Sequence, residues 1–379
     1  MNDILAEPHF KVQPREDLLM RKTVSIIFSM LLIISILSGC AGDCRSEDAA
    51  VVSPGETPVG SSQTPASESN NETAASPEAG VSSEEPEAGA QIDSGVPAVY
   101  FTSEISPESL VAIYSALGAE PFGNIAIKVH TGEPPGSNYL RPELIGDLVR
   151  LIGGTIVETN AVGGRRASNA MHMQVAKDHG FLDLAPFDLL DADGEISLPI
   201  IGGEVLSEVL VGANFPNYDY YVVLSHFKGH ASAGYGGAIK NLAIGLASAP
   251  GKSLIHSGGT RRTGYSGNQE NFLKGMAEAS MAIVDHLNGN LLYINVMNRL
   301  SVDCDCMGNP AEPDMHDIGI LASFDPVALD QACVDLIYLA SDGDSLIRRI
   351  ESRNGIHTLE HAGAIGLGSR EYVLVSLDD

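Results

Sequence analysis

Histidines, lysines and glycines crowd the stretch between Ser225 and Asn241. It follows an apolar run at residues 218–225 that predicts a strand buried on both faces, and ligands of an open α/β sheet bind beyond the carboxyl ends of its strands. Glycine lets a backbone approach a ligand closely, and lysine supplies positive charge. We therefore predict a loop that binds an anionic small molecule through Lys228, Gly234, Gly236, Gly237, Lys240 and Asn241. The alternative is a glycine turn selected for packing, with both lysines on the surface.

Gly245 and the pair Gly251-Lys252 resemble a phosphate-binding P-loop at first sight. Five residues rather than four separate the two glycines, and a helical pattern rather than a strand precedes them, so we reject nucleotide hydrolysis. Lys252 stays a candidate ligand-binding residue and His256 a candidate metal ligand, because Gly251 is expected to end a helix and redirect the chain.

Cys304 and Cys306 form the second candidate site. Residues two apart in an extended chain share a face, so both thiolates could bind one ion, and imidazole joins thiolate on zinc or iron. The spacing predicts a single zinc or iron ion with ligands drawn from Cys304, Cys306, His226, His230, His256 and His316. A disulfide between the two cysteines, or thiols that merely pack, are the alternatives. Cys333 is expected in the core.

Charged and polar residues at the ends of two more predicted strands could also rim a cleft; they are His130, Glu133, Glu158, Asn160, Arg165 and Arg166. Taken singly, each is more often part of a surface turn. Asp325 is expected to cap the helix that follows it. A serine hydrolase is excluded, because the chain has no Gly-x-Ser-x-Gly elbow.

Short β-rich runs alternate with helical patterns from residue 98 onward, as in an α/β sheet. Strands are predicted at 98–102, 124–130, 155–159, 218–225 and 291–297, and helices at 107–117, 142–152 and 326–339. Residues 191–194 are typical of a turn that joins two antiparallel strands. We predict a single large α/β domain with a mixed, mostly parallel sheet flanked by helices, after a disordered tether.

The N-terminal part predicts an export signal and that tether. Residues 21–22 are basic, residues 23–37 are apolar, and small residues precede Cys40, the pattern of a lipoprotein signal peptide. We expect residues 1–40 to be this signal, with Met20 as its true start and Cys40 as the lipidated residue. Residues 41–97 are acidic, rich in Ser, Pro, Glu and Ala, and too poor in apolar residues to fold, so they predict a disordered linker.

This organisation places the domain at residues 98–379 on the extracytoplasmic face of the cell membrane. An uncleaved N-terminal anchor is the alternative to lipidation, and it gives the same location. The chain has 22 Lys and Arg residues against 49 Asp and Glu, a net charge of −27, which excludes a nucleic-acid partner. The expected partners are membrane lipid, through Cys40, and an anionic small molecule; no protein partner is predicted.

Five motifs, in order, resemble those of the domain-of-unknown-function family 362. They are His226-Phe-Lys-Gly-His230, Gly234-Tyr-Gly-Gly-Ala-Ile-Lys-Asn241, Gly251-Lys252 with His256, Asp303-Cys-Asp-Cys306, and the stretch from Asp317 to Asp330. The resemblance covers residues 99–377 and implies that these motifs form one shared site on an α/β core. Many relatives carry a ferredoxin-like insert after the counterparts of Gly251 and His256. Residues 257–269 hold no cysteine here, so we expect no iron-sulfur cluster.

Two classes of function are consistent with these observations. The first is a lipid-anchored extracytoplasmic protein that performs redox or metal-assisted chemistry on a small molecule at a His/Cys metal site beside an anion-binding loop. The second is a solute-binding lipoprotein without catalysis. Proteins of that second class usually have two similar lobes, and the sequence shows no duplicated lobe.

Overall fold

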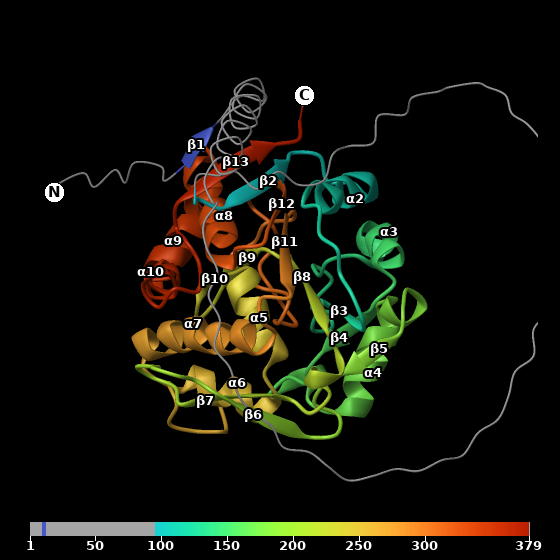
Figure 1. The fold of residues 1–379 in the computed structure, drawn as a ribbon, viewed down its shortest axis with the longest axis vertical. Helices are drawn as coiled ribbons and strands as arrows, with labels where there is room; N and C mark the ends of the chain where they lie inside the picture. Colours follow the sequence, from blue (N-terminus) through green and yellow to red (C-terminus); the bar gives the residue numbers. More distant parts are fainter. Residues whose placement is uncertain (1–9, 13–94, 379) are drawn as a thin grey trace, which may run out of the picture. The chain divides into compact units, whose positions relative to one another are not determined.

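The computed structural model describes residues 10–12 and 95–378 of the chain (Figure 1). Apart from the short strand β1 (Phe10–Val12), the predicted signal peptide with Met20 and Cys40 lies outside the described residues, as does the predicted linker up to residue 94. In the described part, no helix combines the length and the apolar character that crossing a membrane requires. The predicted domain that starts near residue 98 is described in full, except for its last residue.

A large sheet forms the centre of this domain, with strand order β1-β13-β2-β12-β11-β8-β3-β4-β5 among the described residues. Every pairing in it is parallel except the two made by β12, so the prediction of a mixed, mostly parallel sheet is confirmed. Its strands after β1 are β2 (Ala98–Thr102), β3 (Ile125–Lys128), β4 (Thr155–Glu158), β5 (Phe187–Leu189), β8 (Tyr220–His226), β11 (Leu291–Met297), β12 (Gly319–Ser323) and β13 (Tyr372–Ser376).

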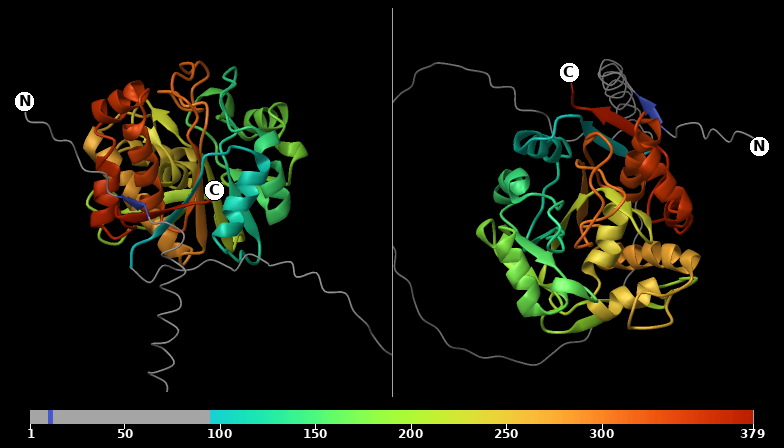
Figure 2. Two further views of the ribbon diagram at one scale, coloured as in Figure 1. Left: turned by 90° about the horizontal axis from the view of Figure 1, so that it is seen from above. Right: turned by 180° about the vertical axis from the view of Figure 1, so that it is seen from behind.

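Helices cover both faces of the sheet (Figures 1 and 2). On one face lie α2 (Pro107–Ala116), α3 (Pro142–Ile152) and α4 (Asn169–Asp178); on the other lie α5 (Ala238–Leu246), α6 (Ala249–His256), α7 (Gln269–His286), α8 (Pro326–Leu339), α9 (Asp344–Ser352) and α10 (His357–Ala364). Each face has its own apolar core. Alternate residues of β8 serve the two cores, since Tyr221 and Val223 pack on one side and Val222 and Leu224 on the other. This explains the continuous apolar run that predicted the strand.

The sequence located several elements closely. The predicted strands at 98–102 and 291–297 and the predicted helices at 142–152 and 326–339 have the bounds of β2, β11, α3 and α8. The Asp325 side chain accepts hydrogen bonds from the Val327 and Ala328 N–H groups, so its predicted role as a helix cap is confirmed. Cys333 is fully buried, as expected of a core residue.

Two local predictions were wrong. Residues 191–194 do not join paired strands: β5 lies in the large sheet, whereas β6 (Glu195–Pro199) pairs with β7 (Glu208–Gly212) in a separate antiparallel sheet. Gly251 does not end a helix but lies near the start of α6. A Cβ atom at Gly251 would lie 2.2 Å from the Leu210 carbonyl oxygen, so glycine is needed for α6 to approach β7.

Candidate functional site

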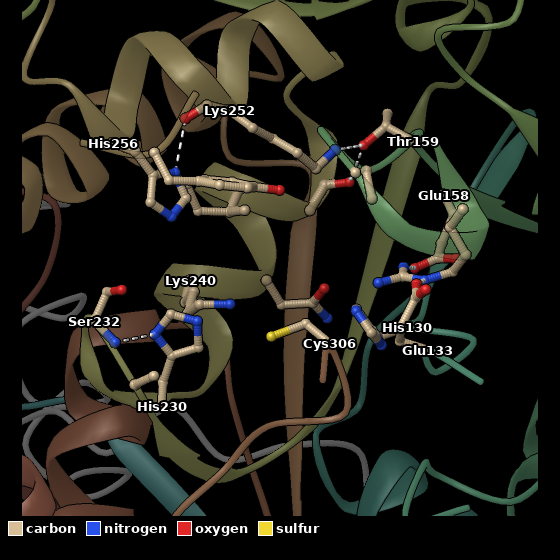
Figure 3. Close-up of a pocket in the computed structure, with 18 of the residues that line it drawn as sticks. His130, Glu133, Glu158, Thr159, His230, Ser232, Lys240, Lys252, His256 and Cys306 are labelled. Atoms are coloured by element: carbon tan, nitrogen blue, oxygen red, sulfur yellow. Dashed lines mark hydrogen bonds and ion pairs between the residues drawn. The ribbon is translucent and has the colours of Figure 1, made fainter. Parts of the chain in front are cut away.

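A cavity of about 330 Å³ opens at the carboxyl ends of the adjacent parallel strands β8, β3 and β4 (Figure 3). Side chains reach it from the ends of β3 and β4, from β9 (Lys228–His230), from α5 and α6, and from the loop after β11. This is the edge at which open α/β sheets bind ligands. We call the cavity the basic pocket; its charged, histidine and cysteine residues are Lys128, His130, Glu133, Glu158, Arg166, His230, Lys240, Lys252, His256 and Cys306.

Positive charge exceeds negative charge in the basic pocket, although the chain as a whole carries −27. Four basic side chains line it, Lys128, Arg166, Lys240 and Lys252, against the two carboxylates Glu133 and Glu158. Burial is the largest cause that lowers the lysine pKa values, to about 8 for Lys128 and Lys240 and to about 7 for Lys252. Neighbouring cations lower them further. The pocket therefore has the electrostatics of an anion site.

Hydrogen bonds hold two of the three pocket lysines in place beside the cavity. The Lys252 ammonium donates to the Thr159 hydroxyl at 2.5 Å and to the Ala247 carbonyl at 2.7 Å. The Lys128 ammonium donates to the Asn241 carboxamide oxygen at 3.0 Å and to the Val129 carbonyl. Lys240 differs from both, because its ammonium has no hydrogen-bond partner among the described residues. It is the basic group left available to a ligand.

Both carboxylates of the basic pocket are engaged by Arg166. The guanidinium lies 3.2 Å from Glu133 and 3.3 Å from Glu158, and all three side chains are buried. Glu158 also contacts His172 behind the pocket at 2.5 Å. Burial alone would raise the pKa of Glu158, but His172 and Arg166 hold it well below its usual range. Glu158 is therefore ionised and has its charge already matched.

The backbone sets which nitrogen of each pocket histidine carries the proton. His130 Nδ1 accepts from the Gly132 N–H at 3.2 Å, and His230 Nδ1 accepts from the Ala233 N–H at 2.9 Å. A nitrogen that accepts carries no proton, so the neutral rings hold it on Nε2 and donate from there. His256 is the reverse, since its Nδ1 donates to the Lys252 carbonyl at 2.7 Å and leaves Nε2 with a lone pair.

Burial lowers the pKa of all three pocket histidines, that of His256 to about 4. They are consequently neutral at pH 7. His256 also stacks on Phe272, with ring centroids 4.4 Å apart, which fixes the ring plane. The pocket thus offers two N–H donors, His130 and His230, and one basic lone pair, on His256.

Cys304, Cys306 and His230 form a group that could hold a metal ion. One ligand atom from each lies within 4.8 Å of the others. The two sulfurs are bonded to each other as a disulfide, in a turn rather than in the extended chain that we expected. A metal ion at this group therefore requires the two cysteines to be reduced. It also requires His230 Nε2 to give up its proton, because Nδ1 accepts backbone hydrogen bonds.

The structure does not bring every predicted ligand to this group. Both nitrogens of His226 contact acceptors, the Asp305 carboxylate and the Asn298 carbonyl, each at 2.8 Å. His316 is exposed and pairs with Asp342 at 2.7 Å. His256 lies in the same basic pocket as His230, where its Nδ1 is already a donor. Of the predicted metal ligands, only His230, Cys304 and Cys306 cluster in the described part of the chain.

The predicted anion-binding residues divide in the same way. Lys240, Asn241 and Lys252 line the basic pocket, and Gly236 and Gly237 line a smaller adjoining cavity of about 60 Å³. Lys228 is buried outside the basic pocket, where its ammonium contacts Asp305 at 2.7 Å. Burial would raise the pKa of Asp305, but His226 and Lys228 lower it. Gly234 lies in β10 (Gly234–Gly236) and packs against Ile350 and Gly355.

Close packing positions the helix that carries Lys240 and Asn241. The buried Asp330 carboxylate of α8 accepts from the Ala238 N–H at 2.7 Å and from the Ile239 N–H at 3.0 Å, and so caps the first turn of α5. A Cβ atom at Gly237 would lie 2.3 Å from this carboxylate. A Cβ atom at Gly245 would lie 2.6 Å from the Lys128 stem. Both glycines are thus required by close approach rather than by a turn.

Sequence reasoning also missed residues of the basic pocket. Lys128, Thr159 and Tyr265 were not among the candidates, whereas His130, Glu133, Glu158 and Arg166 were weighed only as isolated rim residues. Lys128 carried a usable signal, because it is a lone charge within the apolar run at 124–130. A lysine buried inside a parallel strand needs a reason beyond packing.

Replacing Lys240 by methionine should stabilise the ligand-free protein at pH 7. No hydrogen bond is lost and an unpaired, partly buried cation is removed, so the free energy of unfolding should rise by about 1–3 kcal/mol. The gain should shrink as pH rises through the interval from about 8 to 10.5, because the wild-type amine loses its proton first in the folded state. Urea unfolding at pH 7 and pH 10 measures both effects. Lys274→Met, which removes an amine paired with Glu204 and Glu270, is the control and should show no gain.

Comparison with other proteins identifies the family of the chain and two distantly similar structures. No curated protein matches the chain. Among solved structures, the lactate racemase apoprotein from Thermoanaerobacterium thermosaccharolyticum is 14% identical, with a TM-score of 0.39, over 64% of this chain and 57% of that one. A Thermotoga maritima protein is 13% identical, with a TM-score of 0.35, over 68% and 58%.

The chain therefore spans less than two thirds of either protein, and at these TM-scores neither likeness informs the activity of this chain. The family described as "Domain of unknown function (DUF362)" matches residues 125–335. That range runs from β3 to α8 and contains every residue that lines the basic pocket. The chain is thus a member of the DUF362 family, and its candidate site lies within the part that defines the family.

Proposed function

We propose that this protein binds a small anionic molecule in the basic pocket and catalyses proton transfer on it. The observation that carries the proposal is the buried excess of positive charge, with the Lys240 ammonium left without a partner among the described residues. Burying cations is costly unless an anion matches them. A cavity of about 330 Å³ is within the range that small-molecule sites occupy.

The histidines give this anion site a chemical role. His130 and His230 donate from Nε2 and can bind oxygen atoms of the ligand. His256 Nε2 can accept a proton, and its basicity should increase when a bound anion offsets the charges of Lys240 and Lys252, which lower its pKa in the empty pocket. A pocket that served only to capture a solute would not need this base. Pure solute binding, the second class from the sequence, therefore receives less support.

Anion binding should depend on the pocket lysines. Phosphate and pyruvate should both stabilise the wild-type domain against heat, by mass action on the folded state. Lys240→Gln and Lys128→Gln should each weaken binding by about tenfold or more, the loss expected for one charge-assisted hydrogen bond. Isothermal titration and thermal shift measure this. Lys274→Gln is the matched control, and equal affinity in all four proteins would refute the anion site.

A metal centre is the second candidate function, because His230, Cys304 and Cys306 converge. We propose zinc or iron as the ion, from the preference of thiolate and imidazole ligands. The bound ion would act as a Lewis acid or a redox centre at the rim of the basic pocket, which Cys306 lines. Removing the metal would then abolish that chemistry without removing the lysines that bind the anion.

Protein purified anaerobically with reduced cysteines should carry a stoichiometric metal ion, detected by elemental analysis. The double variant Cys304→Ser/Cys306→Ser should lose it, because serine is a poor ligand for these ions. His316→Ala is the control that should retain the metal, since His316 pairs with Asp342 on the surface. Negligible metal in the reduced wild type would leave the disulfide as the working state of this pair.

We also propose that Cys40 carries a lipid that anchors the domain on the extracytoplasmic face of the membrane. The support is the sequence pattern of a basic pair, an apolar run and small residues before Cys40. Cys40→Ser should move the protein out of the membrane fraction and remove the lipid from its N-terminal peptide, as mass spectrometry would show. Cys44→Ser tests the neighbouring cysteine and should change neither result; fractionation unaffected by Cys40→Ser would contradict the anchor.

A further inference from the structure

The proposed function uses the Lys240 side chain only as a positive charge and gives its amine no chemical step. Lys240 lies on the first turn of α5 and lines both the basic pocket and the smaller adjoining cavity. Its stem passes over β10, where a Cβ atom at Gly236 would lie 3.1 Å from Cδ and 3.9 Å from Nζ. Glycine at 236 therefore leaves room for the lysine stem. The Lys240 side chain lies among the residues that line the basic pocket (Figure 3).

The other two pocket lysines are already committed to structural hydrogen bonds. Lys128 donates to Asn241, and Lys252 donates to Thr159 and Ala247. Lys240 has no such bond among the described residues. Desolvation, together with the cations Lys128 and Arg166, lowers the pKa of its amine. A desolvated lysine beside other cations holds part of its population as the neutral amine, and the neutral amine is the nucleophile.

We propose that Lys240 forms an imine with the carbonyl carbon of a small 2-oxo acid bound in the basic pocket. This inference rests on the proposed anion site and names its substrate class. A 2-oxo acid has the two features that the lining selects, a carboxylate for the cations and a carbonyl for an amine. The Nε2–H groups of His130 and His230 can donate to its oxygen atoms.

The step balances without an oxidant or a reductant. The neutral Lys240 amine adds to the carbonyl carbon, and a C–N bond forms as the carbonyl π bond opens. The resulting carbinolamine loses its hydroxyl group as water and becomes the imine. Both hydrogens of that water come from the amine. Once protonated, the imine acidifies the C–H bond beside it, and His256 Nε2 is the base that takes this proton. Reprotonation and hydrolysis return the free lysine.

Borohydride trapping tests the imine directly. The experiment uses the full chain, incubated with pyruvate and then with borohydride. Intact mass spectrometry should show one reduced pyruvate adduct, and peptide mapping should place it on Lys240. Lys240→Arg keeps the charge and should reduce the adduct to background, whereas Lys274→Arg, the matched control outside the basic pocket, should retain it. Urea unfolding confirms that both variants fold.

The outcomes separate this inference from the proposed function. Stabilisation by pyruvate without an adduct would overturn the imine and leave the anion site standing, and so would an adduct on any other lysine. No stabilisation by pyruvate or phosphate, together with no adduct, would overturn both. Acetone, which lacks the carboxylate, should give much less adduct than pyruvate at equal concentration. In deuterium oxide, exchange of the pyruvate methyl protons should fall to background in Lys240→Arg and in His256→Gln.

Discussion

Burial of several positive charges beside too few negative ones is the constraint on which the site depends. Lys128, Arg166, Lys240 and Lys252 meet where parallel strands end, and only two carboxylates accompany them. Such an arrangement lowers the stability of the ligand-free protein, and the proposed anion would supply the missing charge. The surrounding contacts offset part of this charge. Arg166 forms ion pairs with both carboxylates, and hydrogen bonds hold two of the three lysines.

The parallel arrangement of β8, β3 and β4 explains how residues far apart in the sequence converge. Lys128 ends β3 and His130 lies two residues beyond it, whereas Glu158 ends β4 and Thr159 follows directly. Helices α5 and α6 form another wall of the cavity, and their side chains Lys240 and His256 point into it. Backbone acceptors and donors fix the proton on each pocket histidine, so the fold decides which ring nitrogen donates and which accepts.

The fold could be predicted well from the sequence, and the site only in part. Apolar runs such as 291–297 and capped helices such as 326–339 are local signals, so their bounds agree with the structure. The stretch from Ser225 to Asn241 and the pair Cys304 and Cys306 were also locally visible. Convergence is not local, however. Whether His226 turns toward Asp305 or toward the cysteines depends on packing across the sheet, and the same holds for His316 and Lys228. The role of Gly251 was predicted wrongly because glycine is required there by the close approach of Leu210, a residue distant in sequence.

The cap that Asp330 provides links α8 to the first turn of α5 by hydrogen bonds. Burial raises the pKa of this carboxyl to about 6, and its oxygens reach Ala238, Ile239 and, from β11, the Asn295 carboxamide. The first turn of α5, which carries Lys240, is thus hydrogen-bonded to α8, and α8 is hydrogen-bonded to β11. Substitutions on the far side of α8, outside the cavity, should therefore be transmitted to Lys240, and a search for variants with altered chemistry can begin there.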